Sequence, residues 1–194
     1  MNKLILTSRG LTTGVGRELI GNEIKKYDLS GEKIFVFHEP NVFTEKPIKE
    51  ACIDMGFDEK NIIFSSDKNN LKDITNCKFY YCGEGNCFEI LSLMREKHVV
   101  EAIRLAFSGG DRIYIGASAG ASIAGSSIKE LMDFEKDIIG MKDYTALELY
   151  KGLIIPHYNK HQLKTYISNS PGIETRYNNI VNVSNDGILV MEVS

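Results

Sequence analysis

Short apolar stretches alternate along the chain with longer stretches in which apolar residues recur at three- and four-residue steps. Most of the short stretches are apolar throughout, which is typical of strands that are covered on both faces. They predict strands at residues 3–7, 33–38, 61–64, 79–82, 112–115, 153–155, 180–183 and 188–191. The longer stretches predict helices at residues 16–27, 44–55, 86–94, 99–107 and 159–168.

This order of strands and helices predicts an α/β fold with a three-layer, doubly wound and mostly parallel sheet, because parallel neighbours are joined by right-handed crossovers. No linker, repeat or low-complexity tract divides the 194 residues, so we expect one domain over residues 1–194. Ligands of such folds bind beyond the carboxyl ends of the strands. The polar residues that follow the strands are therefore the candidate site residues.

The composition narrows the function classes. Residues of the AVILMFWYC set make up 43% of the chain, charged residues make up 25%, and the net charge is −3. The chain is too apolar for disorder, and it has no global basic field for nucleic acid or an anionic membrane. No apolar run approaches the roughly 20 residues of a membrane span, and the first residues lack the apolar stretch of a secretory signal. We expect a cytoplasmic protein with neither nucleic-acid nor membrane partners.

Four cysteines occur, and three of them, Cys77, Cys82 and Cys87, are spaced by five residues. This spacing fits neither a C-x-x-C redox motif nor a zinc site. We expect the cysteines to be buried thiols that act as small apolar side chains.

The strand at residues 112–115 runs directly into Gly116-Ala117-Ser118-Ala119-Gly120, and a helix-like stretch follows. The order strand, G-x-S-x-G, helix is typical of a nucleophile elbow. A serine on so sharp a turn needs neighbours without Cβ atoms two residues away on each side. The pattern favours Ser118 as a nucleophile and the Ala119 N–H as an oxyanion donor, against a close-packed turn without chemistry.

A serine hydroxyl needs a general base, and His157 is the best placed of the four histidines. It follows the strand at 153–155 and Pro156, which biases the residue before it to extended geometry. His161, four residues later, could complete a metal pair, but no carboxylate at metal-ligand spacing accompanies the two histidines. We predict that His157 is the base and that the site needs no metal or organic cofactor.

Two carboxylates are candidates for the group that orients the imidazole. Asp133 lies fifteen residues after Ser118, within a run of acidic residues that could be a solvated face. Asp186 lies in the turn between the last two predicted strands, and Asp186-Gly187 is also an ordinary hairpin turn. The sequence does not choose between them.

The turn Gly83-Glu84-Gly85-Asn86 follows the strand at 79–82. Glycine there permits positive φ and a close backbone approach, so the Gly85 N–H is the candidate second oxyanion donor. Asn86 is placed to cap the helix that follows.

These three motifs, Cys82-Gly83-Glu84-Gly85-Asn86, Tyr114 to Ala121 and Ile155-Pro156-His157-Tyr158, resemble those of the peptidase E (dipeptidase E) family of serine peptidases, S51. The resemblance implies a fold like that of class I glutamine amidotransferases (flavodoxin-like). It also implies a small cytoplasmic hydrolase of short peptides, typically α-aspartyl dipeptides, with Ser118 as nucleophile, His157 as base, and Gly85 and Ala119 at the oxyanion. Asp133 and Asp186 both fall where the family places acidic residues important to activity.

The chain departs from the family pattern in its glycine-rich turn, which usually reads G-G-G-N or G-G-D-Q. Glu84 in the middle position would add negative charge near the mouth of the site and repel an acidic substrate. Glu84, Asn86 and Lys160 are candidate substrate-binding residues, and Lys164 and Arg176 are further candidates for the family's basic residue.

The expected partner is a short peptide substrate, and the expected assembly is a monomer or a homodimer. Two other readings remain open. One is a different serine acyl hydrolase, an esterase or amidase on the same elbow. The other is an inactive ligand-binding module of the same fold.

Overall fold

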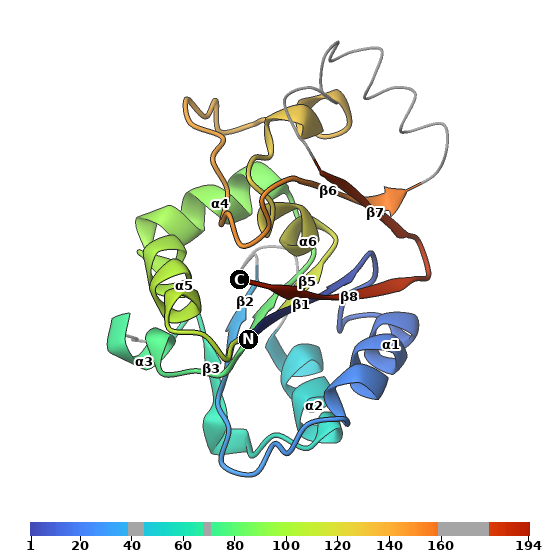
Figure 1. The fold of residues 1–194 in the computed structure, drawn as a ribbon, viewed down its shortest axis with the longest axis vertical. Coiled ribbons are helices and arrows are strands. Elements are labelled where there is room, and N and C mark those ends of the chain that lie inside the picture. Colours follow the sequence, from blue (N-terminus) through green and yellow to red (C-terminus); the bar gives the residue numbers. More distant parts are fainter. Residues whose placement is uncertain (39–44, 68–70, 159–178) are drawn as a thin grey trace.

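The computed structural model describes residues 1–38, 45–67, 71–158 and 179–194 (Figure 1). Its strands are β1 (Asn2–Thr7), β2 (Ile34–Phe37), β3 (Ile62–Phe64), β4 (Phe79–Cys82), β5 (Ile113–Ala117), β6 (Leu153–Tyr158), β7 (Ile180–Ser184) and β8 (Ile188–Val193). Its helices are α1 (Gly14–Ile24), α2 (Glu45–Met55), α3 (Leu71–Thr75), α4 (Cys87–Glu96), α5 (Val99–Ser108) and α6 (Ala119–Ile123), with 3₁₀ turns η1 (Glu59–Asn61) and η2 (Lys129–Asp133).

Six strands form the central sheet in the order β3-β2-β4-β5-β1-β8. The first five are parallel, and β8 closes one edge antiparallel to β1. The register pairs Thr7 with Ala117 and Cys82 with Gly116, so the carboxyl ends of β1, β4 and β5 meet at one place. The predicted α/β class with a mostly parallel sheet is confirmed.

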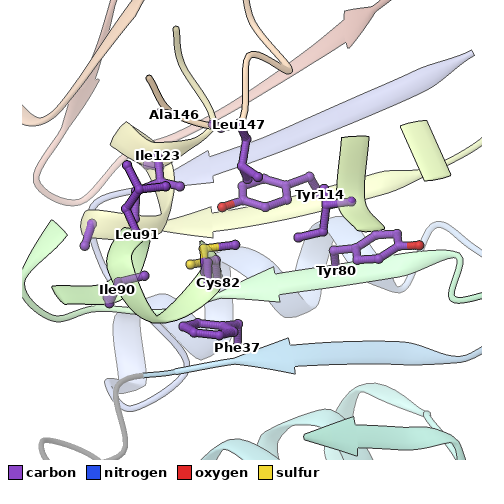
Figure 2. Close-up of a cluster of buried hydrophobic side chains, with 14 of the residues drawn as sticks. Phe37, Tyr80, Cys82, Ile90, Leu91, Tyr114, Ile123, Ala146 and Leu147 are labelled. Carbon is purple, nitrogen blue, oxygen red and sulfur yellow. The ribbon is translucent and has the colours of Figure 1, made fainter. Parts of the chain in front are cut away.

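Alternate residues of the inner strands supply two different cores. In β2, Phe35 and Phe37 join the cluster that also includes residues of α4, α5 and α6, whereas Ile34 and Val36 join the cluster with residues of α1 and α2. Figure 2 shows the first cluster, in which strand residues such as Phe37 and Tyr114 face Leu91 and Ile123 of the helices. Both faces of the sheet are covered, which explains why these strands are apolar throughout.

Strands β6 and β7 do not join the central sheet. They pair with each other, in parallel, as a separate two-stranded sheet, and β6 packs on α6 (Figure 1). The hairpin reading of Asp186-Gly187 is therefore wrong, because the turn joins β7 to β8 and these strands belong to different sheets. An apolar run reveals a strand but not its partner, since pairing depends on distant residues.

The predicted helices correspond to α1, α2, α4 and α5 with small shifts at their ends. Helix α1 begins earlier than predicted because the Thr13 hydroxyl accepts a hydrogen bond from the Gly16 N–H and caps it. Helix α3 was not predicted. The helix predicted at 159–168 lies outside the described residues. Within the described ranges, no helix has the length and apolarity to cross a bilayer.

The four cysteines are free and buried, as predicted. Loss of solvation raises the pKa of the Cys52, Cys77 and Cys82 thiols to about 12. In the unfolded chain a thiol titrates near pKa 8.5. Between these two pKa values the folded state keeps thiol protons that the unfolded state releases. The free energy of unfolding therefore falls as the pH rises above about 8.5, whereas below pH 8.5 these thiols do not change it.

We therefore expect native protein at pH 8 to react slowly with a thiol reagent such as dithionitrobenzoate, and denatured protein to react at once. Urea unfolding at pH 7.5 and pH 10 should show lower stability at the higher pH. The Cys52→Ala variant should lose less stability between these two pH values than the wild type. Rapid labelling of all four thiols in the native state would contradict the burial.

Candidate active site

Ser118 occupies a strained turn between β5 and α6. Its backbone has φ 51° and ψ −111°, a region that residues other than glycine seldom adopt. The Ser118 N–H donates to the Thr7 carbonyl at 2.9 Å, which ties the turn to the end of the neighbouring strand. The sharp strand-to-helix turn that the motif predicts is present.

The two glycines of the motif are required by close backbone contacts. A Cβ atom at Gly116 would lie 2.7 Å from the Gly120 carbonyl oxygen, and one at Gly120 would lie 2.0 Å from the Cys82 carbonyl oxygen. Side chains at either position would push α6 away from β4 and β5. The position of the Ser118 hydroxyl therefore depends on these two missing side chains.

The Ser118 hydroxyl and the His157 imidazole lie within hydrogen-bond distance. Ser118 Oγ is 2.9 Å from His157 Nε2, although the residues are 39 positions apart in the sequence. Accepting the hydroxyl proton requires the Nε2 lone pair, so the neutral ring would carry its proton on Nδ1. The geometry is that of a nucleophile with its base.

A second serine holds the backbone of the histidine. The His157 N–H donates to Ser8 Oγ at 2.7 Å, and the Ser8 hydroxyl donates to the Val183 carbonyl at 3.1 Å. Ser8 is fully buried and directly follows β1. Ser8 thereby connects the small β6–β7 sheet to the central sheet. The residue that it holds, His157, has a backbone φ of 53°. Ser8 is the first polar residue after the strand predicted at 3–7, but no sequence pattern predicts this contact with His157.

The partner of His157 Nδ1 is an amide. Asn185 Oδ1 lies 2.9 Å from Nδ1 and can accept a hydrogen bond from the Nδ1–H group. The neighbouring Asp186, the sequence candidate, lies 3.5 Å from Arg9 Nε, and its side chain is largely exposed. Asp133, the other candidate, lies in η2, and its side chain is outside what the structure describes. Asn185 belongs to the same polar turn as Asp186, but the sequence did not point to it because only carboxylates were expected in the orienting role.

A pocket of about 150 Å³ opens beside the serine. Ser118, His157, Gly85 and Ala119, four of the predicted site residues, all contribute to its wall. Gly85 has φ 144°, and Ala119 begins α6 directly after the serine. The remaining described wall residues are Cys87, Ser122, Leu131, Phe134, Glu135 and Pro156.

Glu84 and Asn86 do not line this pocket, and both have structural partners. The Glu84 carboxylate accepts hydrogen bonds from the Gly10 N–H at 2.9 Å and from the Thr12 hydroxyl. Asn86 Oδ1 accepts from the Phe88 and Glu89 N–H groups, so it caps α4 as predicted. The third candidate, Lys160, lies outside the described residues. Within the described part of the chain, no three His, Cys, Asp or Glu side chains gather as a metal site.

Comparison with known proteins places this geometry in context. The sequence model of Peptidase family S51 matches residues 43–192. Peptidase E of Shewanella denitrificans is 28% identical over 116 residues, which cover 59% of this chain and 47% of that protein. Peptidase E of Haemophilus influenzae is 32% identical over 115 residues, which cover 59% and 50%. These alignments span about half the length of the relatives.

Solved structures share the fold. A crystal structure of a candidate peptidase E protein from Listeria monocytogenes superposes with a TM-score of 0.67 at 22% identity and covers 100% of both chains. A peptidase from an acI-B1 actinobacterium superposes with a TM-score of 0.63 at 14% identity, covering 99% of this chain and 84% of the other.

The close packing at Gly120 generates a test of the elbow. We expect Gly120→Ala to destabilise the fold by about 2 kcal/mol or more, because the new Cβ meets the Cys82 carbonyl. The matched control is Gly14→Ala at the first position of α1, where a Cβ meets nothing within 4 Å. Urea unfolding of both variants measures the difference, and equal stabilities would contradict the packing argument.

Proposed function

We propose that this chain, which belongs to Peptidase family S51, is a serine-type peptidase that hydrolyses short peptides through an acyl-enzyme. The observation that carries the proposal is the 2.9 Å distance between Ser118 Oγ and His157 Nε2 at the edge of a pocket. Aspartyl dipeptides are the substrates that the family resemblance suggests. We also propose a cytoplasmic location and a monomer or homodimer.

In the proposed mechanism His157 Nε2 takes the Ser118 proton as Oγ attacks the scissile carbonyl carbon. The carbonyl oxygen becomes an oxyanion that the Gly85 and Ala119 N–H groups stabilise. The protonated imidazole then gives its proton to the leaving amine as the carbon–nitrogen bond breaks. Water, deprotonated by the same imidazole, hydrolyses the resulting ester and regenerates the serine. These groups supply every proton transfer, so the proposal needs no cofactor.

Asn185 takes the orienting role in this scheme. Its Oδ1 accepts a hydrogen bond from the Nδ1–H group, which keeps that proton on Nδ1 and leaves Nε2 free to act as the base. An amide fixes the ring as a carboxylate does, as in cysteine peptidases with a Cys-His-Asn arrangement, but it adds no full negative charge beside the imidazolium. Asp186, the next residue of the turn, carries a negative charge that its ion pair with Arg9 partly neutralises.

We expect Ser118→Ala to lower kcat on the best dipeptide by a factor of about 10³ or more, because nucleophile and base act as a unit. A fluorophosphonate probe should label the wild type at Ser118 and should not label the variant. Labelling together with ester but not peptide hydrolysis would indicate a different acyl hydrolase. An unlabelled, inactive wild type would indicate a binding module.

Substitutions at two neighbouring residues of one turn, Asn185 and Asp186, test which of these two side chains orients the imidazole. We expect Asn185→Ala to lower kcat by about tenfold to 100-fold, because the imidazole loses the acceptor that fixes its tautomer. The matched control, Asp186→Ala, removes an exposed carboxylate paired with Arg9 and should change kcat by less than about threefold. The reverse order of effects would assign the orienting role to Asp186.

A further inference from the structure

We infer that Glu84 is a positioning residue for the oxyanion site. Its carboxylate, bound by the loop that follows β1, fixes the backbone turn that carries the Gly85 N–H. This inference rests on the proposed peptidase function and adds to it a residue that does not touch the reacting atoms. It gives Glu84 a role inside the protein, in place of the substrate contact that the sequence suggested.

The Gly85 N–H belongs to a peptide unit with few constraints of its own. A peptide unit is planar, so the direction of this N–H depends on the ψ angle of Glu84 and the φ angle of Gly85. Gly85 has φ 144°, and glycine has more conformational freedom than any other residue. Within the described ranges, the Gly85 N–H donates to no backbone carbonyl, which leaves it available to an oxyanion. Another contact of the turn must therefore fix its direction.

The two ends of the turn are anchored, and the peptide unit of the donor lies between them. The N–H and the carbonyl of Gly83 each make a backbone hydrogen bond of 3.1 Å. Asn86 caps α4 through its side chain. Between these two residues only Glu84 has a side chain, because Gly85 has none. The Glu84 side chain is therefore the one that can hold this peptide unit in place.

Both carboxylate oxygens of Glu84 are bound by the loop that follows β1. Oε1 accepts the Gly10 N–H at 2.9 Å, and Oε2 accepts the Thr12 hydroxyl. A Cβ atom at Gly10 would lie 2.8 Å from the Glu84 carboxyl carbon, so this close approach requires glycine there. Hydrogen bonds to an ionised carboxylate are stronger than those between neutral groups. The carboxylate is therefore tied to a loop that is 72 to 74 positions away in the sequence.

The same loop is anchored to two other parts of the site. The Leu11 N–H donates to the buried Tyr81 hydroxyl at 3.0 Å, which holds the loop against β4. At the start of the loop, the Ser8 hydroxyl accepts the His157 N–H at 2.7 Å. One loop thus contacts the strand that leads into the oxyanion turn, the turn itself and the backbone of the base. Glu84 joins the turn to this common support.

A role in positioning has a characteristic kinetic consequence. The oxyanion exists only after Ser118 Oγ has attacked the carbonyl carbon, so a misplaced Gly85 N–H weakens transition-state stabilisation and not substrate binding. A misplacement of about 1 Å can cost about 100-fold in rate. Loss of the Glu84 contacts should therefore lower kcat and leave KM nearly unchanged. A carboxylate that contacted the substrate would instead act on KM through its charge.

Glu84→Ala and Glu84→Gln separate these two roles, because both remove the charge and only the alanine variant removes the hydrogen bonds. The glutamine Oε1 can accept the Gly10 N–H, and its Nε2 can donate to the Thr12 hydroxyl oxygen. We expect Glu84→Ala to lower kcat on the best dipeptide, and the rate of fluorophosphonate labelling at Ser118, by about tenfold or more, with KM within about twofold. Glu84→Gln should keep both rates within about threefold of the wild type.

Thr12→Val supplies a second measurement, which also serves if Glu84→Ala does not fold. It removes one of the two hydrogen bonds and keeps the shape of the side chain, so kcat should fall by about threefold with KM unchanged. The double variant Glu84→Ala/Thr12→Val should be no slower than Glu84→Ala, because the two residues share one contact. Unchanged kcat in Thr12→Val, or additive losses in the double variant, would contradict the shared contact.

Glu50→Ala, on the exposed face of α2, is the matched control and should leave kcat, KM and labelling unchanged. A folded Glu84→Ala protein with the kcat of the wild type overturns the inference. Equal losses in the two Glu84 variants, or a loss confined to KM, also overturn it, because they assign the effect to the charge. A wild type that fluorophosphonate does not label would instead count against the proposed function, so the two failures are distinguishable.

Discussion

The hydrogen bond between Ser118 and His157 joins two parts of the fold that share no sheet. The serine follows a strand of the central sheet, and the histidine lies on the small sheet formed by β6 and β7. Both residues have positive φ, close to 50°, which costs about 1–3 kcal/mol at a residue with a side chain. Surrounding contacts must therefore hold both backbones in place.

Those contacts come from small groups at the carboxyl ends of the strands. Gly120 packs its α-carbon against the Cys82 carbonyl, and Ser8 binds the His157 N–H. Each contact is possible only because the side chain is absent or very short. The precision of the site thus comes from close backbone packing, with the reactive side chains extending from it.

The sequence was informative where short-range patterns determine structure. Short, mostly apolar runs located all eight described strands. The G-x-S-x-G run located the turn at Ser118, because the steric requirements there act within five residues. The partners of polar side chains followed no such local rule. Asn185 lies at the imidazole where a carboxylate was expected, and Glu84 binds the loop after β1 and not the pocket. These choices depend on which distant segments the fold brings together.

Because β6 and β7 form their own sheet, the base can be lost without disrupting the central sheet. A two-stranded sheet is marginal by itself and depends on what it packs against. Opening of this unit would withdraw the imidazole from the hydroxyl and would also expose Leu153, Ile154, Ile155 and Val183, which belong to one of the two hydrophobic clusters. The site is therefore lost at the opening of this one unit, before the hydrogen bonds between the strands of the central sheet are broken.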